Sequence, residues 1–263
     1  MLKYPGFLLL ALLASSPALA GKASDWLHTE GGSIRIVTEA EATAEGVLRG
    51  ALQVVLKPGW KTYWADPGDS GIPPSLHVSD TPGMGEPTIG FPAPKLIDDG
   101  YAPFVGYDRP VTLALSFPVA DGKVPASFTA DLFLGVCETI CIPVQGSLEV
   151  ADAPNGLPTD ELVARAFADL PGEADEAFQA RLVGIRDDSL VIEAEYPDDA
   201  SVIELHVVSN GSRMFGLAER TDRDGSMFLL PFTDTDVQAS PVQAIYTLVT
   251  DVGAVTGTLR IPH

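Results

Sequence analysis

Residues 127–150 read SFTADLFLGVCETICIPVQGSLEV, and this stretch decides the fold of the first half of the chain. Apolar and polar residues alternate on both sides of a short centre, Cys137-Glu-Thr-Ile-Cys141. Alternation of this kind is typical of half-buried strands in an antiparallel sheet. We therefore predict a β-hairpin with Cys137 and Cys141 flanking the turn at its tip. That turn would bring the two Cβ atoms to the roughly 3.8 Å that a disulfide needs.

Similar alternating runs occur along most of the chain, separated by glycine, proline and turn dipeptides. Together they predict an all-β protein with two β-sandwich-like domains joined by a short helical connector. The other predicted strands are Ser33–Val37, Leu48–Leu56, Val111–Phe117, Leu182–Ile185, Leu190–Tyr196, Val202–Val208, Met227–Leu230, Ala244–Val249 and Val255–Ile261.

The segment between the second and third of these strands, residues 57–110, is too long for a simple hairpin loop. It is rich in proline and glycine, yet it also holds several aromatic residues, in which disordered segments are poor. We therefore expect this segment to be packed. Its aromatic residues are Trp60, Tyr63, Trp64, Phe91, Tyr101, Phe104 and Tyr107.

The N-terminus has the three parts of a secretory signal peptide, which predicts export of the protein. Lys3 gives the positive region, Phe7–Leu13 the apolar region and Ala18-Leu-Ala20 the small-residue cleavage site. No later apolar run reaches the roughly 18 residues that a membrane-spanning helix needs, so we expect no membrane insertion after cleavage.

The remaining residues divide into three regions. Residues 21–152 are predicted to form the first β-sandwich, residues 153–180 a helical linker and residues 181–263 the second β-sandwich. In the linker, Thr159 is the expected N-cap of a helix that Pro171-Gly172 ends. A short second helix is expected over residues 173–180.

The net charge of −20, from 16 basic and 36 acidic residues, bears on the class of partner. Most of the surface would repel a polyanion, so nucleic acid and anionic lipid are poor candidate partners.

Cys137 and Cys141 are the two cysteines of the chain. In an exported protein they are expected to be able to form a disulfide. As a structural clip, closing so short a loop would constrain the unfolded chain by only about 2 kcal/mol. A short bond near solvent is also the kind that exchanges readily. The residues alone leave a structural clip and a redox centre equally open.

The charges near the pair favour a raised thiol pKa. Glu138 lies between the cysteines and Asp131 is the nearest charged residue upstream. Reactive cysteines normally have a cation or a helix N-terminus nearby. We therefore predict a pair that reacts slowly alone and mainly when a partner protein supplies the activating environment.

Three separated motifs carry a resemblance to a known family: LKPGWKTYWADPGDSGIPP at residues 56–74, FPAP and DDGY at residues 91–94 and 98–101, and CETICIP at residues 137–143. Over about residues 30–152 the chain resembles the N-terminal periplasmic domain of the DsbD/ScsB thiol:disulfide interchange (protein-disulfide reductase) family. Over residues 181–263 the resemblance is weaker and rests on the two-domain layout of the ScsB-like branch.

The resemblance implies an immunoglobulin-like fold in the periplasm. Its cysteine pair would accept electrons from a membrane-embedded DsbD/CcdA-like reductase and pass them to periplasmic thioredoxin-like proteins. Cys141 would engage the downstream partner, and Cys137 would resolve the mixed disulfide. Aromatic residues of the long loop would shield the pair, with Tyr63, Trp64, Tyr101, Phe104 and Tyr107 as candidates. The larger family members continue into a transmembrane domain and a thioredoxin-like domain, whereas this sequence stops at His263 and has no Cys-x-x-Cys. We therefore expect either that the electrons come from a separate membrane protein or that this form has another role.

The residues also suggest two other kinds of site, a serine-protease nucleophile and a copper site. Gly68-Asp-Ser-Gly71 resembles the nucleophile motif of trypsin-like proteases, but a suitably placed histidine base is missing and a turn is favoured. The two thiols could instead hold Cu(I) with Met84, His77 or His206, in a copper-binding or copper-tolerance module. None of those three residues has ligand spacing from the pair, so no cofactor is expected and Cu(I) is kept as an alternative.

Overall fold

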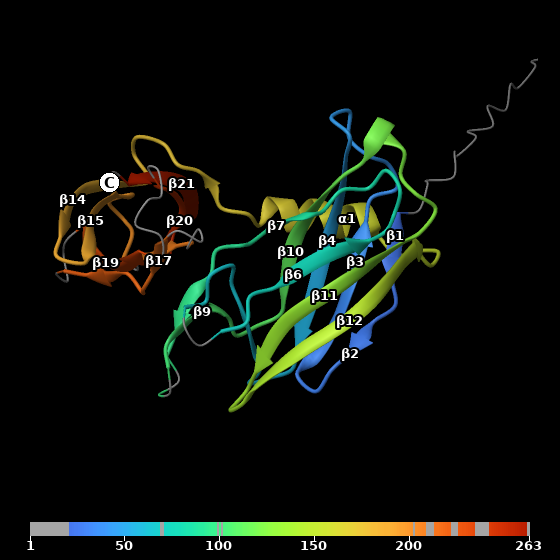
Figure 1. Ribbon diagram of the computed structural model, residues 1–263, viewed down its shortest axis with the longest axis horizontal. Helices are drawn as coiled ribbons and strands as arrows, with labels where there is room; N and C mark the ends of the chain where they lie inside the picture. Colours follow the sequence, from blue (N-terminus) through green and yellow to red (C-terminus); the bar gives the residue numbers. More distant parts are fainter. Residues whose placement is uncertain are drawn as a thin grey trace, which may run out of the picture.

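The computed structural model describes residues 21–68, 71–98, 100, 102–201, 203–208, 213–221, 226–234 and 242–261. Their strands form two bodies that lie one after the other along the long axis (Figure 1). The described part of the chain contains no helix with the length and apolar character needed to cross a membrane. The predicted signal peptide, residues 1–20, lies outside the described residues.

The first domain combines strands β1 to β12 with helix α1 and a 3-10 turn, η1. Its elements are β1 (Lys22–Ser24), β2 (Leu27–His28), β3 (Gly32–Thr38), β4 (Val47–Leu56), β5 (Lys61–Tyr63), β6 (Ser75–Ser79), β7 (Thr88–Gly90), β8 (Lys95–Ile97), β9 (Phe104–Tyr107), β10 (Val111–Pro118), η1 (Ala120–Gly122), β11 (Phe128–Cys137), β12 (Cys141–Asp152) and α1 (Thr159–Ala168).

These strands form a sandwich whose two layers enclose one apolar core. Figure 1 shows β3, β4 and β10 in one layer and β11 and β12 in the other. Strand β1 pairs with both β3 and β12 and so joins the layers at one edge. Alternate side chains of β11 point into the core and are at most 3% exposed, namely Phe128, Ala130, Leu132, Leu134 and Val136. The all-β class and the predicted strands of this half are confirmed.

The long segment 57–110 is packed, as predicted, and holds five of the short strands. Within it, β5 pairs with β11 and β9, while β6 runs along the middle of β11. Trp60, Tyr63, Trp64, Phe104 and Tyr107 are all buried. The segment therefore belongs to the first domain and brings aromatic side chains to the end of β11 where Cys137 lies.

Helix α1 covers the outer face of the layer formed by β3, β4 and β10. Val163 and Ala166 pack there against the small side chains of Val37, Ala51 and Ala114. Thr159, the predicted N-cap, is instead the first helical residue, and Pro158 is the N-cap. The buried hydroxyl of Thr159 accepts the N–H of Gly21 at 3.1 Å, which ties the start of the described chain to the helix.

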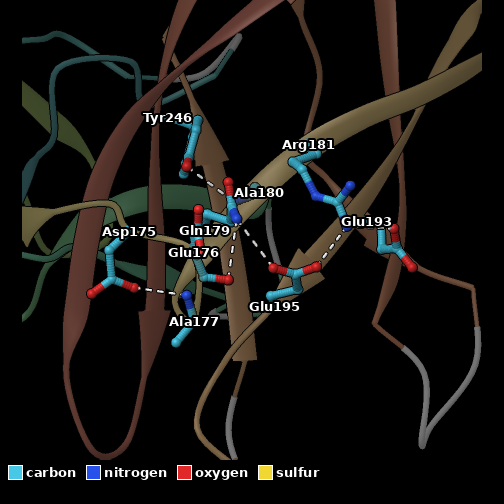
Figure 2. A network of polar contacts seen from close by, with 9 residues as sticks. All are labelled: Asp175, Glu176, Ala177, Gln179, Ala180, Arg181, Glu193, Glu195 and Tyr246. Atoms are coloured by element: carbon cyan, nitrogen blue, oxygen red, sulfur yellow. Dashed lines mark hydrogen bonds and ion pairs between the residues drawn. The ribbon is translucent and has the colours of Figure 1, made fainter.

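The predicted second helix over residues 173–180 is wrong. Gly172–Glu173 forms strand β13, and strand β14 begins at Gln179. Between them the side chain of Asp175 accepts the N–H groups of Ala177 and Phe178 at 2.8 and 2.9 Å, as part of the network in Figure 2. An aspartate that bonds the backbone two and three residues ahead stabilises a turn in competition with a helix.

The second domain is built from two smaller sheets around its own core. Its strands are β13 (Gly172–Glu173), β14 (Gln179–Arg186), β15 (Ser189–Glu195), β16 (Ile203–Val207), β17 (Arg213–Phe215), β18 (Glu219–Arg220), β19 (Met227–Asp234), β20 (Val242–Thr250) and β21 (Ala254–Ile261). One sheet has the order β13-β21-β20-β16 and the other β14-β15-β19-β17. Leu190, Ile192, Phe228, Leu230 and Leu248 are almost fully buried between them.

Candidate functional site

The cysteines lie at the end of the β11–β12 hairpin, as predicted. Cys137 and Cys141 are direct partners in the strand register, and residues 138–140 form the turn between them. Their Sγ atoms are 2.8 Å apart and both are free thiols. The hairpin thus places two sulfur atoms where a bond between them can form or break with little movement of the backbone.

The two thiols differ in access to solvent. Cys137 is only 6% exposed, whereas Cys141 is an exposed residue. Ile140, beside Cys141 in the turn, is 75% exposed. A protein that approaches the tip therefore meets Cys141 and Ile140 before it can meet Cys137.

Tyr63 is the aromatic residue that covers the pair. Its hydroxyl lies 2.7 Å from the Sγ of Cys141, and its side chain is 1% exposed. Its ring packs edge-on against Phe104, with the centroids 5.0 Å apart. Ile97 and Ile72 complete a small apolar cluster around Cys137. Tyr63 and Phe104 of the predicted shielding residues are therefore brought to the site.

Trp64 and Tyr107, two of the other predicted shielding residues, do not join this cluster. Trp64 packs in the main core, with its ring centroid 5.8 Å from that of His206 in the second domain. Tyr107 also lies in the main core, and its hydroxyl donates to the carbonyl of Pro92 at 2.8 Å. Tyr101 lies outside the described residues.

Gly135 makes room for the Tyr63 ring. A Cβ atom at this position would lie 2.6 Å from Cε2 of Tyr63 and 2.9 Å from Cβ of Ile72. The hydroxyl of Thr62 donates to the carbonyl of Gly135 at 2.8 Å, which fixes β5 beside β11. A glycine within a strand is a sequence signal for such a close approach, although it does not identify the approaching group.

Replacing Gly135 with alanine is expected to push the Tyr63 ring away and to lower the free energy of unfolding by about 1–3 kcal/mol, the usual cost of overpacking. Chemical denaturation measures this change, and the rate of thiol alkylation reports the displaced ring. Gly184→Ala is the control, because Gly184 is a strand glycine with open space at its Cβ position. Equal destabilisation by the two variants would contradict the packing argument.

Burial is the largest cause of a raised pKa at Cys137. It acts together with the hydrogen bond to Cys141 and raises the pKa from 9.0 to about 11, although the bond to Tyr63 and the charge of Lys61 oppose it. Burial and the bonds to the cysteines also raise the pKa of Tyr63, which keeps the phenol protonated. At neutral pH the thiol of Cys137 therefore keeps its proton and is a weak nucleophile.

The direction of this shift agrees with the sequence prediction, but the predicted cause was wrong. Asp131 lies about 20 Å up the strand at roughly 3.3 Å per residue, and its carboxylate accepts hydrogen bonds from Ser79 and Ser147. The charge that faces the pair is a cation, Lys61, which is the register partner of Cys137 on β5. Lys61 also donates to the backbone carbonyl of Glu138 at 3.5 Å. Residues close in sequence gave the wrong local charge, because Lys61 on β5 is 76 residues from Cys137 in the sequence.

The candidate copper ligands lie in other parts of the molecule. His77 pairs with Glu86, Met84 forms a backbone bridge to Val119, and His206 bonds Glu204. Within the described ranges, no group of three or more histidine, cysteine, aspartate or glutamate side chains is arranged to hold a metal ion. Of the protease-like motif, Asp69 and Ser70 lie outside the described residues.

Comparisons with known proteins bear on the family of the first domain and on the fold. Residues 35–153 match the family model described as thiol:disulfide interchange protein DsbD, N-terminal. The structure is similar to the crystal structure of the N-terminal periplasmic domain of ScsB from Proteus mirabilis, with a TM-score of 0.72 at 20% identity, over 92% of this chain and 98% of that one. The titin Ig tandem A164-A165 aligns with a TM-score of only 0.21 at 10% identity, over 92% of this chain and 97% of that one. A search of curated protein sequences gave no match.

Proposed function

We propose that the chain is a periplasmic thiol/disulfide exchange protein, because residues 35–153 match the family model of the N-terminal part of thiol:disulfide interchange protein DsbD. It relays electrons through Cys137 and Cys141 from a membrane-embedded DsbD/CcdA-like reductase to thioredoxin-like partners. The observation that carries this proposal is the asymmetry of the pair. An exposed thiol at the tip of a hairpin lies 2.8 Å from a buried one.

The exposed position of Cys141 suits it to attack the partner. As a thiolate, its Sγ forms a bond to one sulfur of the partner's disulfide, the partner's S–S bond breaks and the other partner sulfur leaves as a thiolate. A mixed disulfide between the two proteins results. Cys141 is favoured over Cys137 for this step because the partner can reach it without displacing Tyr63.

Cys137 then resolves the mixed disulfide. After losing its proton, its Sγ forms a bond to Sγ of Cys141, and the second partner sulfur leaves as a thiolate. Two electrons have passed to the partner, and the protons of the two thiols go to the two released thiolates. The dithiol of the membrane reductase reverses the same steps and restores the reduced pair.

The high pKa of Cys137 supports selectivity in this relay. With a pKa of about 11, its thiol is almost entirely protonated at neutral pH. Cys137 therefore resolves the mixed disulfide rapidly only when a bound partner changes the surroundings of the pair so that the Cys137 thiol loses its proton more readily. The exposed Ile140 next to Cys141 offers an apolar contact for that partner.

The periplasmic location rests on two observations. The predicted signal peptide at residues 1–20 would direct export of the chain, and the similar ScsB domain is described as periplasmic. An exported location is also one in which a cysteine pair can cycle through a disulfide, whereas cytosolic thiols are kept reduced.

The reduction potential of the pair tests the proposed function. We expect a value above about −300 mV, because the bond closes a short loop at a solvent-facing tip, whereas inert structural disulfides lie below that value. Equilibration of the full chain in defined thiol/disulfide buffers, followed by alkylation of the free thiols, gives the potential. The double variant Cys137→Ser/Cys141→Ser provides the background for alkylation. A potential well below −300 mV would mean that the pair is a structural clip.

A further inference from the structure

Three short strands carry the side chains that cover Cys137, and we call them the arm: β5, β8 and β9, residues 61–63, 95–97 and 104–107. In the sheet they follow β11 in the order β5-β9-β8, so β8 is the edge strand. Tyr63, Ile97 and Phe104 of the arm form the cluster with Cys137. Figure 1 shows β9 at the end of the first domain that is nearest the second domain.

The neighbours of these covering residues contact the second domain. Trp64 follows Tyr63, and its ring is inclined at 60° to the ring of His206. Leu96 precedes Ile97, and its backbone N–H donates to Oε2 of Glu204 at 2.9 Å. The arm therefore lies between the cysteine pair and the second domain.

Strand β16 supplies both contacts from the second domain. Ile203, Leu205 and Val207 are buried in the core of that domain. Glu204 and His206 alternate with them and project from the other face of β16. Oε2 of Glu204 lies 3.0 Å from Nε2 of His206, whose side chain is 5% exposed. The same carboxylate oxygen of Glu204 therefore contacts both the backbone N–H of Leu96 in the arm and the buried ring of His206 in the second domain.

The carboxylate of Glu204 accepts a hydrogen bond from β8, the edge strand of the arm. The backbone of Leu96 pairs with Val105 of β9 on the inner side of β8. On the outer side, where an edge strand would present an unpaired N–H, the acceptor is Glu204. Burial raises the pKa of Glu204, but the bonds from His206 and Leu96 and the charge of Lys95 outweigh it and lower the pKa overall. The acceptor is therefore charged at neutral pH, and a charged acceptor makes a stronger hydrogen bond.

We propose that Glu204 is a positioning residue for the redox pair: by holding the N–H of Leu96, it keeps Ile97 and Phe104 seated on Cys137. The second domain thereby sets how readily Cys137 can be reached. This inference rests on the proposed function for its biological meaning, because the burial of Cys137 among Ile97 and Phe104 keeps its thiol protonated and so slows its attack on the mixed disulfide. A domain that served only as a passive appendage would leave that access unchanged.

The test is the rate at which Cys137 of the reduced full chain is alkylated by iodoacetamide at fixed pH. Glu204→Ala is expected to raise this rate by about tenfold, a change in the opening equilibrium equivalent to about 1.4 kcal/mol. Glu204→Gln retains an acceptor oxygen for the Leu96 N–H and should stay within about threefold of the wild-type rate. Fragmentation of the labelled peptide by mass spectrometry distinguishes Cys137 from Cys141.

Glu193→Ala is the matched control. Glu193 is also a glutamate on a strand of the second domain, but it pairs with Arg181 on β14 (Figure 2). Its variant should leave the alkylation rate of Cys137 unchanged. The proposal is overturned if Glu204→Ala reacts at the wild-type rate, or if Glu193→Ala accelerates the reaction equally, since that would indicate general loosening of the second domain.

The result of this alkylation test does not depend on the result of the reduction-potential test of the proposed function. Alkylation of reduced protein needs no redox partner and does not depend on the reduction potential. A pair with the potential of a structural clip could still show the Glu204 effect. Conversely, an unchanged alkylation rate would remove the role of Glu204 without affecting the assignment of Cys137 and Cys141 as the exchanging pair.

Discussion

A Cys137→Ser variant is expected to accumulate as a mixed disulfide with its partner through Cys141. The exposed Cys141 can still attack, but the sulfur that would release the partner, 2.8 Å away, is gone. Turnover should fall by at least about a thousandfold, as is typical when one member of a catalytic unit is removed. Non-reducing electrophoresis of the variant mixed with an oxidised thioredoxin-like protein, followed by mass spectrometry of the adduct, measures the trapping.

The reciprocal variant gives the control. Cys141→Ser leaves only Cys137, which is 6% exposed and whose pKa is raised chiefly by burial. It should yield little adduct under the same conditions, and the double variant none. If Cys141→Ser captured the partner as well as Cys137→Ser does, the assignment of Cys141 as the attacking residue would be wrong.

Removing the Tyr63 side chain should give the second large effect. Burial is the largest cause of the raised pKa of Cys137, so Tyr63→Ala should move that pKa from about 11 toward 9.0. The thiolate fraction of Cys137 at pH 7 would then rise by up to about 100-fold, since each pKa unit changes it about tenfold. The pH profile of the alkylation rate at Cys137 shows this shift directly.

Tyr63→Phe should move the same profile in the opposite direction. The phenylalanine ring keeps Cys137 covered, but it removes the hydroxyl whose hydrogen bond lowers the pKa of Cys137. The profile should therefore shift to slightly higher pH. This variant also guards against a failure of Tyr63→Ala to fold, because deleting a large buried aromatic side chain typically costs about 3–5 kcal/mol. A fall in pKa with both variants would contradict burial as the dominant cause.

The parts of the fold that the sequence predicted well depend on local pattern. Period-two alternation located the hairpin β11–β12, and the spacing of Cys137 and Cys141 placed both at its tip. The aromatic content of residues 57–110 correctly indicated a packed segment. Alternation also located most strands of the second domain.

The parts that could not be predicted depend on pairing between distant residues. That Tyr63 rather than Trp64 reaches the cysteines follows from the register of β5 against β11, more than 70 residues apart in sequence. The same register puts Lys61 beside Cys137. His206 was weighed as a copper ligand because histidine binds metals. Its neighbour Glu204 lies two residues away on the same face of β16, whereas its neighbour Trp64 comes from the first domain and depends on how the two domains pack.

The pairing of β1 with β12 has a consequence for the order in which the chain folds. Gly21 bonds Thr159, and Lys22 to Ser24 pair with Val150 to Asp152. The sandwich therefore closes only when its last strand and the helix contact the start of the described chain, and contacts of such sequence separation slow folding. The cysteine hairpin is local and forms within microseconds, long before β5 brings Tyr63 over it. A folding chain thus passes through a stage in which both thiols are open to oxidants, and its first redox event can precede the native state.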